Sequence, residues 1–486
     1  EFTRTVPIST MADRFLLNAS MPNLPPSPRG TLFASALGFV VVLLDVSVVN
    51  VALDDLRRTW HADMATLQWV VNAYTLVFAA LLLTSGALGD RLGARRVFLA
   101  GFAVFTLASV ACGLAPGEQT LIAARLLQGL GAALLVPNSL SMLQRAFKNP
   151  QARSHAVGWW GAAGGIALAA GPVLGGILVE HWGWRSIFLI NLPVGVVGML
   201  LTQRFADRHE ITHPRRFDWP GQVTAILALA AFASAIGLAT SLGWSDFSVW
   251  GGLLAAVVLV FGFVWIEAHS PSPMLPLSLF RQTTFSVVSI TGIAVNFAYY
   301  GLIFVFSLFF QVHQHLSPQQ TGLAFLPMTL VLMLGNIAAG QLMPRWGARR
   351  LLVAGLTLAA LGYWLTAFAL EGPDWPLALA MMLAATGISL TVPTMTNVTL
   401  SAVDASRTGI ASGVLNSARQ VGGMLGVGVC GYLIQDPSPD AFLAGMRTAI
   451  GLSVVLLVLA ALLCLGKITR ETAHEAAAPA ARKNGG

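Results

Sequence analysis

The chain has 486 residues, of which 56% are hydrophobic and only 10% are charged. A mean hydropathy of +0.72 leaves too little polar surface to cover a soluble globule of this length, so the composition predicts an integral membrane protein. The formal net charge of +7 is not gathered in a basic stretch interleaved with aromatic residues, which argues against a nucleic-acid partner.

Three cysteines, Cys112, Cys430 and Cys464, lie in separate apolar runs. Their spacing matches neither a disulfide framework nor a zinc site, so we expect small core residues and no metal. The sequence also lacks an HExxH motif and a nucleotide-binding loop, which disfavours an enzyme or an ATP-driven pump.

Fourteen apolar stretches have about the 20 residues that are needed to cross a bilayer core. They are 31–53, 67–88, 97–115, 119–143, 156–179, 186–203, 219–240, 248–267, 285–311, 320–343, 351–370, 376–402, 408–434 and 442–466. The first stretch is too long and too polar at its centre for a cleavable signal peptide, so we expect it to remain as a span.

The Lys and Arg residues predict the orientation, because cytoplasmic loops retain positive charge. If both termini are cytoplasmic, 22 of the 28 Lys and Arg residues fall on the cytoplasmic side. Two more, Arg125 and Arg419, lie within spans. We therefore expect a multi-pass protein with both ends in the cytoplasm.

An internal repeat divides the spans into two halves. "GALGDRLGARR" at 86–96 matches "GQLMPRWGARR" at 340–350, and "GAALLVPNSL" at 131–140 matches "GISLTVPTMT" at 387–396. Parallel repeats of six spans are a transporter architecture with a substrate site between the halves. Spans seven and eight have no counterpart in either copy, so we interpret them as an inserted hairpin.

The expected organisation has five parts. They are a cytoplasmic N-terminal segment at 1–30, a six-helix bundle at 31–203, a linker and inserted hairpin at 204–270, a second six-helix bundle at 271–466 and a cytoplasmic tail at 467–486. Within the N-terminal segment, Met11 or Met21 is the expected natural start.

Five strings in order carry a family resemblance that covers nearly the whole chain. They are "LLDVSVVNVAL" at 43–53, "GALGDRLGARR" at 86–96, "RLLQGLGAA" at 125–133, "GIALAAGPVLGG" at 165–176 and "WRSIFLINLP" at 184–193. Together they resemble the major facilitator superfamily, and specifically its fourteen-span drug:proton antiporters. The resemblance implies an all-α integral membrane protein with the major facilitator fold, two six-helix bundles and two extra transmembrane helices.

The resemblance also implies a function. The expected protein is a secondary active transporter of the bacterial cytoplasmic (inner) membrane that exports lipophilic drugs or antibiotics by alternating access. It needs no cofactor, uses the proton gradient as its energy source and functions as a monomer in the lipid bilayer. The alternatives are a proton-coupled transporter of a polar metabolite and, more remotely, a membrane enzyme or channel.

Asp45 and Arg125 are the candidate residues for proton coupling. Asp45 is the only acid in the middle of a predicted span, where an ionised carboxylate costs about 2.5 to 3.5 kcal/mol. Burial therefore favours the protonated form, as a proton carrier needs, although a structural acid is the alternative. Arg125 must find a carboxylate, a carbonyl or water, and either Asp45 or a carbonyl of a neighbouring span fits. In the family that the chain resembles, the arginine at the position of Arg125 is linked to proton transfer.

The loop after span two is the first candidate gate, because in the family it locks the cytoplasmic side of the outward-open state. We expect Asp90 to pair with an arginine of the same loop or with a span of the other half, and we expect the glycines to let the backbone turn. Pro344 replaces the acid in the second copy, so the lock is not symmetric. A loop that serves orientation only is the alternative. The candidate residues are Gly86, Asp90, Arg91, Gly93, Arg95 and Arg96.

Span five is the second candidate gate, because its Gly-Pro string marks exporters in the family. We expect Gly171 and Gly175 to allow close packing against the other half and Pro172 to weaken the helix locally. Static packing of small residues is the alternative.

Aromatic and amide residues on three spans are candidates for the substrate site, because flat apolar surfaces with a few amides suit lipophilic drugs. Each aromatic residue has core packing as its alternative, and Arg419 fits either an anionic substrate or a snorkelling position. The candidates are Trp69, Asn72, Tyr74, Gln128, Asn138, Asn296, Phe297, Tyr299, Tyr300 and Arg419.

Overall fold

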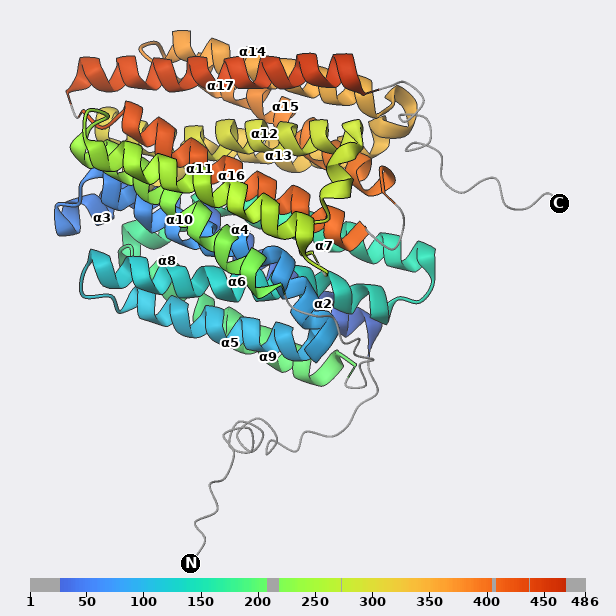
Figure 1. Cartoon of the computed structure of the whole chain (residues 1–486). Coiled ribbons are helices and arrows are strands. Elements are labelled where there is room, and N and C mark those ends of the chain that lie inside the picture. The colour runs from blue at the N-terminus through green and yellow to red at the C-terminus, as the bar shows by residue number, and fades with distance from the viewer. Residues whose placement is uncertain (1–26, 208–217, 272, 404–407, 437, 469–486) are drawn as a thin grey trace, which may run out of the picture.

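The computed structural model of the chain describes residues 27–207, 218–271, 273–403, 408–436 and 438–468. These residues form helices and short connections, with no strand among them. The helices run side by side, and the two repeat halves form adjoining bundles (Figure 1). The parts expected before residue 27 and after residue 468 lie outside the described residues.

The N-terminal half has six long helices and two short ones. They are α2 (Pro28–Val51), α3 (Leu53–Trp60), α4 (Met64–Leu92), α5 (Ala94–Gly113), α6 (Glu118–Ala146), α7 (Pro150–Trp182), α8 (Ser186–Leu189) and α9 (Asn191–Phe205). The hairpin that follows consists of α10 (Trp219–Leu242) and α11 (Phe247–His269).

The C-terminal half begins after a short 3-10 turn, η1 (Leu277–Arg281), and the first of its six long helices continues into a π-helical turn, η2 (Phe309–His313). The six helices are α12 (Thr283–Leu308), α13 (Pro318–Trp346), α14 (Ala348–Ala369), α15 (Asp374–Ser401), α16 (Thr408–Leu433) and α17 (Pro439–Lys467).

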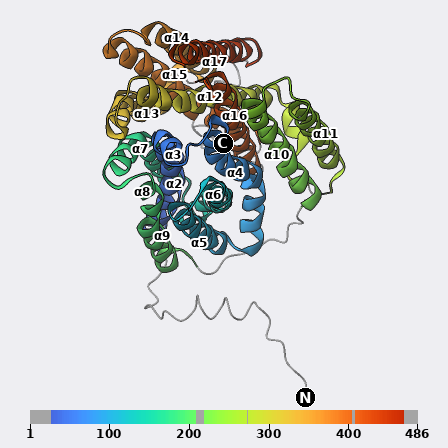
Figure 2. The same cartoon turned by 90° about the vertical axis from the view of Figure 1, so that its left-hand side faces the viewer.

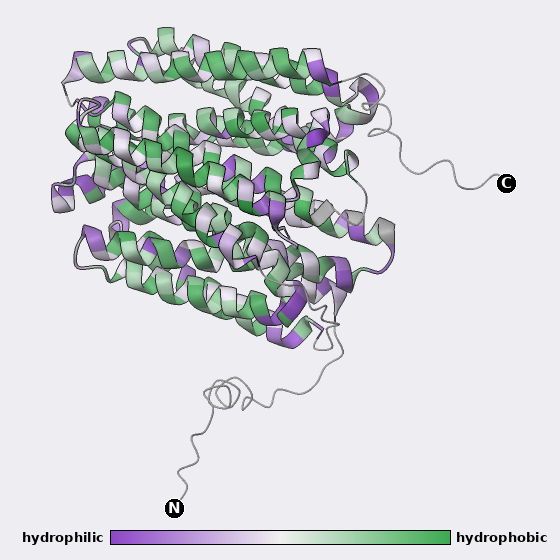
Figure 3. Cartoon of the chain, in the orientation of Figure 1, coloured by the Kyte–Doolittle hydropathy of each residue, from purple (hydrophilic) through white to green (hydrophobic). Residues whose placement is uncertain are grey.

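Thirteen helices of the described residues are long and apolar enough to cross a membrane. Each corresponds to one predicted stretch, and the fourteenth stretch is α16, which is long enough but more polar. Along the bundle, hydrophobic residues cover the middle of the helices and hydrophilic residues gather near their ends (Figure 3). This is the distribution that a bilayer requires.

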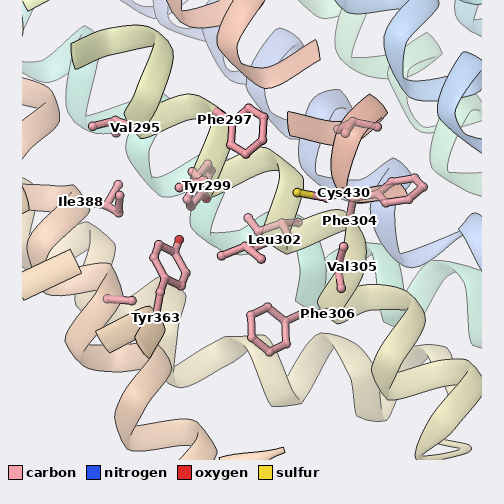
Figure 4. Close-up of a cluster of buried hydrophobic side chains, with 14 of the residues drawn as sticks. Val295, Phe297, Tyr299, Leu302, Phe304, Val305, Phe306, Tyr363, Ile388 and Cys430 are labelled. Carbon is pink, nitrogen blue, oxygen red and sulfur yellow. The ribbon is translucent and has the colours of Figure 1, made fainter. Parts of the chain in front are cut away.

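Two seams join the halves, where α7 packs along α13 and α4 packs along α16 (Figure 2). The first is tight because Gly322 of α13 lies against the carbonyl of Pro172, and Gly176 of α7 lies against that of Pro318. α12 lies at the centre, and 89% of the residues in its apolar 18-residue stretch are buried. Its side chains, including Phe304 and Phe306, fill much of the core (Figure 4).

The inserted hairpin lies on the outside of the α4–α16 seam. α10 contacts both helices of the seam (Figure 2). α11 lies beyond α10, and only 11% of the residues in its apolar 18-residue stretch are buried. Gln68 of α4 donates to the carbonyl of Gly428 in α16 at 3.2 Å and accepts from Thr240 of α10 at 3.2 Å. On the same helix pair, Gln222 of α10 donates to the carbonyl of Ala80 at 2.9 Å. The side-chain amide of Gln68 thus links both halves and the hairpin.

The α12–α16 pair is packed backbone to backbone, and glycines make this possible. A Cβ atom added to Gly426 would lie 2.2 Å from the carbonyl oxygen of Phe297, and one added to Gly422 would lie 2.3 Å from that of Ile293. No side chain fits at either position unless the helices move apart.

We predict that Gly426→Ala lowers the stability of the protein by about 1 to 3 kcal/mol, because the added methyl group meets a backbone oxygen that cannot move aside. The matched control is Gly451→Ala on α17, where a Cβ meets nothing within 4 Å. The measurement is thermal unfolding in detergent. Equal midpoints for the two variants would contradict the packing described here.

Candidate functional site

Asp45 lies at the centre of a polar network inside the N-terminal half. Its side chain is fully buried on α2 and forms an ion pair with Arg125 of α6. Its other carboxylate oxygen accepts hydrogen bonds from Gln128 at 2.7 Å and from Asn191 of α9 at 3.3 Å. Both oxygens are therefore supplied with donors, as a buried carboxylate requires.

Arg125 has both of the partners that the sequence left open. Besides the ion pair, its Nε donates to the backbone carbonyl of Val70 at 3.0 Å, and its Nη1 donates to Gln128 at 2.6 Å. Its guanidinium carbon lies 4.4 Å from the centroid of the Tyr74 ring, a cation–π contact. Only 1% of the side chain is exposed, so these contacts replace its hydration.

A second layer fixes the amides around the ion pair. Ser109 of α5 accepts from Gln128 at 2.7 Å and from Asn191 at 3.2 Å, while the thiol of Cys112 donates to Gln128 at 3.6 Å. Sequence reasoning missed Ser109 and Asn191 as members of this site. Asn191 lies within the quoted string "WRSIFLINLP", whereas Ser109 carries no signal that distinguishes it from a packing serine.

The ion pair is costly to build and sensitive to change. Removing two charges from water is offset only when every donor and acceptor is matched, and the loss of one partner leaves the other buried and unpaired. Val70 and Gln128 bind the guanidinium of Arg125 in addition to Asp45, so the cation has more than one acceptor.

The loop between α4 and α5 is shaped as the repeat predicts. Gly93 ends α4 with φ +96°, and its repeat partner Gly347 ends α13 with φ +76°, both in the left-handed region that favours glycine. Arg95 donates to the carbonyl of Gln203 in α9 at 3.2 Å, and its counterpart Arg349 donates to a carbonyl of α17. In each half this arginine ties the loop to the last helix of the bundle.

Asp90, in the last turn of α4, lies 4.0 Å from Arg145 near the end of α6. The sequence had named the arginines of its own loop, or a span of the other half, as its partners. Arg91 and Arg96 are exposed, and Gly86 lies in ordinary van der Waals contact with Pro137.

The structure corrects the expectation for span five. Gly171 and Gly175 of α7 face α2 of their own half, where added Cβ atoms would meet Ser47 and Val48. In this part of α7, Pro172 and Gly176 approach the other half. They lie one position further along, and one residue turns a helix by about 100°.

A cavity of about 50 Å³ lies between the halves, against the α7–α13 seam. Four of its lining residues, Asn296, Tyr299, Tyr300 and Arg419, were predicted as substrate residues. The others, which sequence reasoning missed, are Gly165, Leu168, Ala169, Val295, Leu332, Asn336, Ile388, Ser389 and Val392. Among these, Ser389 and Val392 fall in the repeated string at 387–396, and Asn336 is a rare amide in an apolar span.

The remaining six predicted substrate residues do not line this cavity. Tyr74 and Gln128 belong to the Asp45 network, and Phe297 packs in the core (Figure 4). Trp69 lines a separate open groove against α10, Asn72 is buried on α4 away from the cavity lining, and Asn138 donates to Ser85 at 3.1 Å. Periodicity identified apolar and polar spans but did not fix which side of each helix turns toward the other half.

Two helical bundles joined by seams, a charge pair buried in one bundle and a cavity between them define a membrane transporter, not an enzyme. The chain belongs to the major facilitator superfamily, whose family profile matches residues 35–427 and, in a second overlapping match, 288–484. It is a multi-pass membrane protein.

Curated relatives are similar over most of the chain. The methylenomycin A resistance protein of Streptomyces coelicolor is 37% identical over 93% of this chain and 95% of its own length. The multidrug resistance protein Stp of Mycobacterium tuberculosis is 37% identical over 83% and 75%. The tetracenomycin C resistance and export protein of Streptomyces glaucescens is 34% identical over 85% and 77%.

Among solved structures, the crystal structure of a D-xylose-proton symporter aligns with a TM-score of 0.66 and 13% identity. The alignment covers 90% of this chain and 98% of that one. At this identity the likeness establishes the fold alone.

We predict that Arg125→Met destabilises the protein by about 3 to 5 kcal/mol, because it leaves Asp45 buried without its cation. Adding Asp45→Asn should recover part of that loss, since no unpaired charge then remains. The measurement is a double-mutant cycle on thermal unfolding in detergent. Arg58→Met is the control and should cost about 1 kcal/mol or less, because the Arg58 side chain is exposed and Arg57 still pairs with Asp54. A double variant no more stable than Arg125→Met would contradict this account.

Proposed function

We propose that this chain is a proton-coupled antiporter that exports lipophilic drugs or antibiotics by alternating access. The observation that carries the proposal is the Asp45–Arg125 pair, buried in one half and separate from the cavity between the halves. The relatives named for multidrug, methylenomycin A and tetracenomycin C resistance support an exporter of small lipophilic molecules.

In the proposed cycle, a proton that enters from outside binds Asp45 and ends the ion pair with Arg125. The guanidinium of Arg125 contacts the ring of Tyr74, which belongs to a buried cluster. Tyr300 of the other half packs against this cluster and also lines the cavity. In the proposed cycle, this packing between the halves couples proton binding to substrate release.

The remaining features of the proposal follow from the same architecture. The protein lies in the bacterial cytoplasmic membrane with both termini in the cytoplasm, uses the proton gradient without a cofactor and works as a monomer. The division into two transport bundles makes the α10–α11 hairpin accessory. Its position outside the α4–α16 seam supports that role, because α10 can steady the seam without lining the substrate path.

We predict that Asp45→Asn reduces transport driven by a pH gradient in proteoliposomes at least tenfold, because the amide cannot exchange a proton. The protein should remain folded, since an amide keeps the hydrogen bonds to Gln128 and Asn191 within reach. The matched control is Asp54→Asn, which changes a buried acid in the first turn of α3 that pairs with Arg57 and Arg58. Gradient-driven transport that persists in Asp45→Asn would overturn the coupling role.

We predict that Asp90→Ala shifts the protein toward its inward-open state, because it removes the acid beside Arg145 at the cytoplasmic end of α4. A cysteine at Gly165, which lines the nearly closed cavity beside Asn336, reports the opening by its rate of maleimide labelling. The three native cysteines are buried and form a low background. The expected rate increase is severalfold.

The control for this experiment is Glu371→Ala, which removes an exposed acid that pairs with Arg447 at the opposite end of the bundle. It should leave the labelling rate of the Gly165 cysteine unaltered. If Asp90→Ala likewise leaves both labelling and transport unaltered, the loop serves orientation in the membrane and is not a gate.

A further inference from the structure

Arg419 is a half-buried guanidinium whose hydrogen-bonding capacity is largely unused. It lies on α16, and its stem packs against Gly292 of α12. Its Nη1 donates to Asn416 at 3.4 Å, while its Nε is fully buried with no hydrogen-bond partner in the described part of the chain. None of the ion pairs between described residues involves it.

The contrast with Arg125 shows what is missing. Arg125 has a carboxylate, a carbonyl and an amide oxygen around it, all supplied by the protein. Arg419 has a cavity in front of it instead, and no acid lines that cavity. A guanidinium removed from water without an acceptor is unfavourable, so the site is built for an acceptor that comes from outside.

The rest of the lining suits the body of an aromatic molecule. Tyr299 and Tyr300 contribute ring surface and hydroxyl groups from α12, and Asn296 and Asn336 contribute amides from two helices. Leu168, Leu332, Ile388 and Val392 make up the apolar walls. A planar guanidinium recognises a carboxylate through two parallel hydrogen bonds, and apolar walls with few polar groups retain the remainder of the ligand.

We propose that Arg419 is the counter-ion for an anionic oxygen of the exported substrate, so that the transported molecules include lipophilic acids that carry a carboxylate or an ionised phenol. This inference rests on the proposed export function and narrows its substrate class. Tyr300 connects the two charges, since it lines the cavity beside Arg419 and packs against the cluster of Tyr74, which covers Arg125.

The present conformation is the nearly closed form of this site. Its volume of about 50 Å³ is well below the roughly 300 to 1,000 Å³ of drug-sized pockets. The walls come from both halves, and Gly165 of α7 approaches Asn336 of α13 to 3.7 Å, measured from its ideal Cβ position. Separation of α7 from α13 would enlarge the cavity and expose Arg419 to an entering anion.

The test compares three probes in everted membrane vesicles energised with a proton gradient. The probes are nalidixic acid, which is an aromatic carboxylate, its uncharged ethyl ester and the cation ethidium. We expect the wild type to accumulate the acid. Arg419→Met should lower the accumulation of the acid relative to ethidium at least tenfold, and Arg419→Lys should retain part of it. Arg58→Met, on the exposed surface of α3, is the control that should preserve the ratio.

A binding measurement separates this inference from the proposed function. In detergent, nalidixate should raise the unfolding midpoint of the wild type but not that of Arg419→Met. Stabilisation that depends on Arg419 without gradient-driven transport of any probe would uphold the anion site and overturn the exporter. Gradient-driven transport of ethidium without stabilisation by nalidixate would do the reverse. Equal loss of acid and ethidium in Arg419→Met would assign the residue to packing and overturn the inference.

Discussion

A carboxylate and a guanidinium buried together in hydrocarbon-facing helices impose the strictest condition on this fold. Asp45 and Arg125 satisfy each other only because α2, α4, α5, α6 and α9 converge on them with an amide, a carbonyl, a hydroxyl and an aromatic ring. Every one of these groups must be in place before the desolvation of the two charges is offset. The N-terminal bundle therefore holds one buried ion pair.

The two halves share a plan but not a chemistry. The loops after their second spans match to the level of a glycine with positive φ, Gly93 or Gly347, followed by an arginine that binds a carbonyl of the last helix. The buried charges do not match, because Arg419 has no acid in its half to correspond to Asp45. The repeat thus holds an ion pair in one half and, in the other, an arginine that lines the cavity and forms no ion pair among the described residues.

The seams between the halves combine close backbone contact with a space that can open. Glycines bring α7 and α13 together at one end, where Gly322 meets the carbonyl of Pro172. Further along the same helix, nothing lies within 4 Å of the Cβ position of Gly158 or Gly161. Close backbone contact is thus found around Pro172, whereas Gly158 and Gly161 are exposed. The α4–α16 seam, covered by α10, is braced through Gln68 on its outer side.

The sequence by itself determined the spans, the two-half repeat and the position of Asp45 and Arg125 as charges within apolar spans. Hydropathy is a local property, and an isolated charge in an apolar span stands out without knowledge of its surroundings. Only the tertiary structure decided that Ser109 and Asn191 complete the ion-pair network, that Gly171 faces its own half and that few of the predicted aromatic residues reach the cavity. The physical reason is that one residue turns a helix by about 100°, so the rotation of each helix, set by its packing partners, selects which side chains meet.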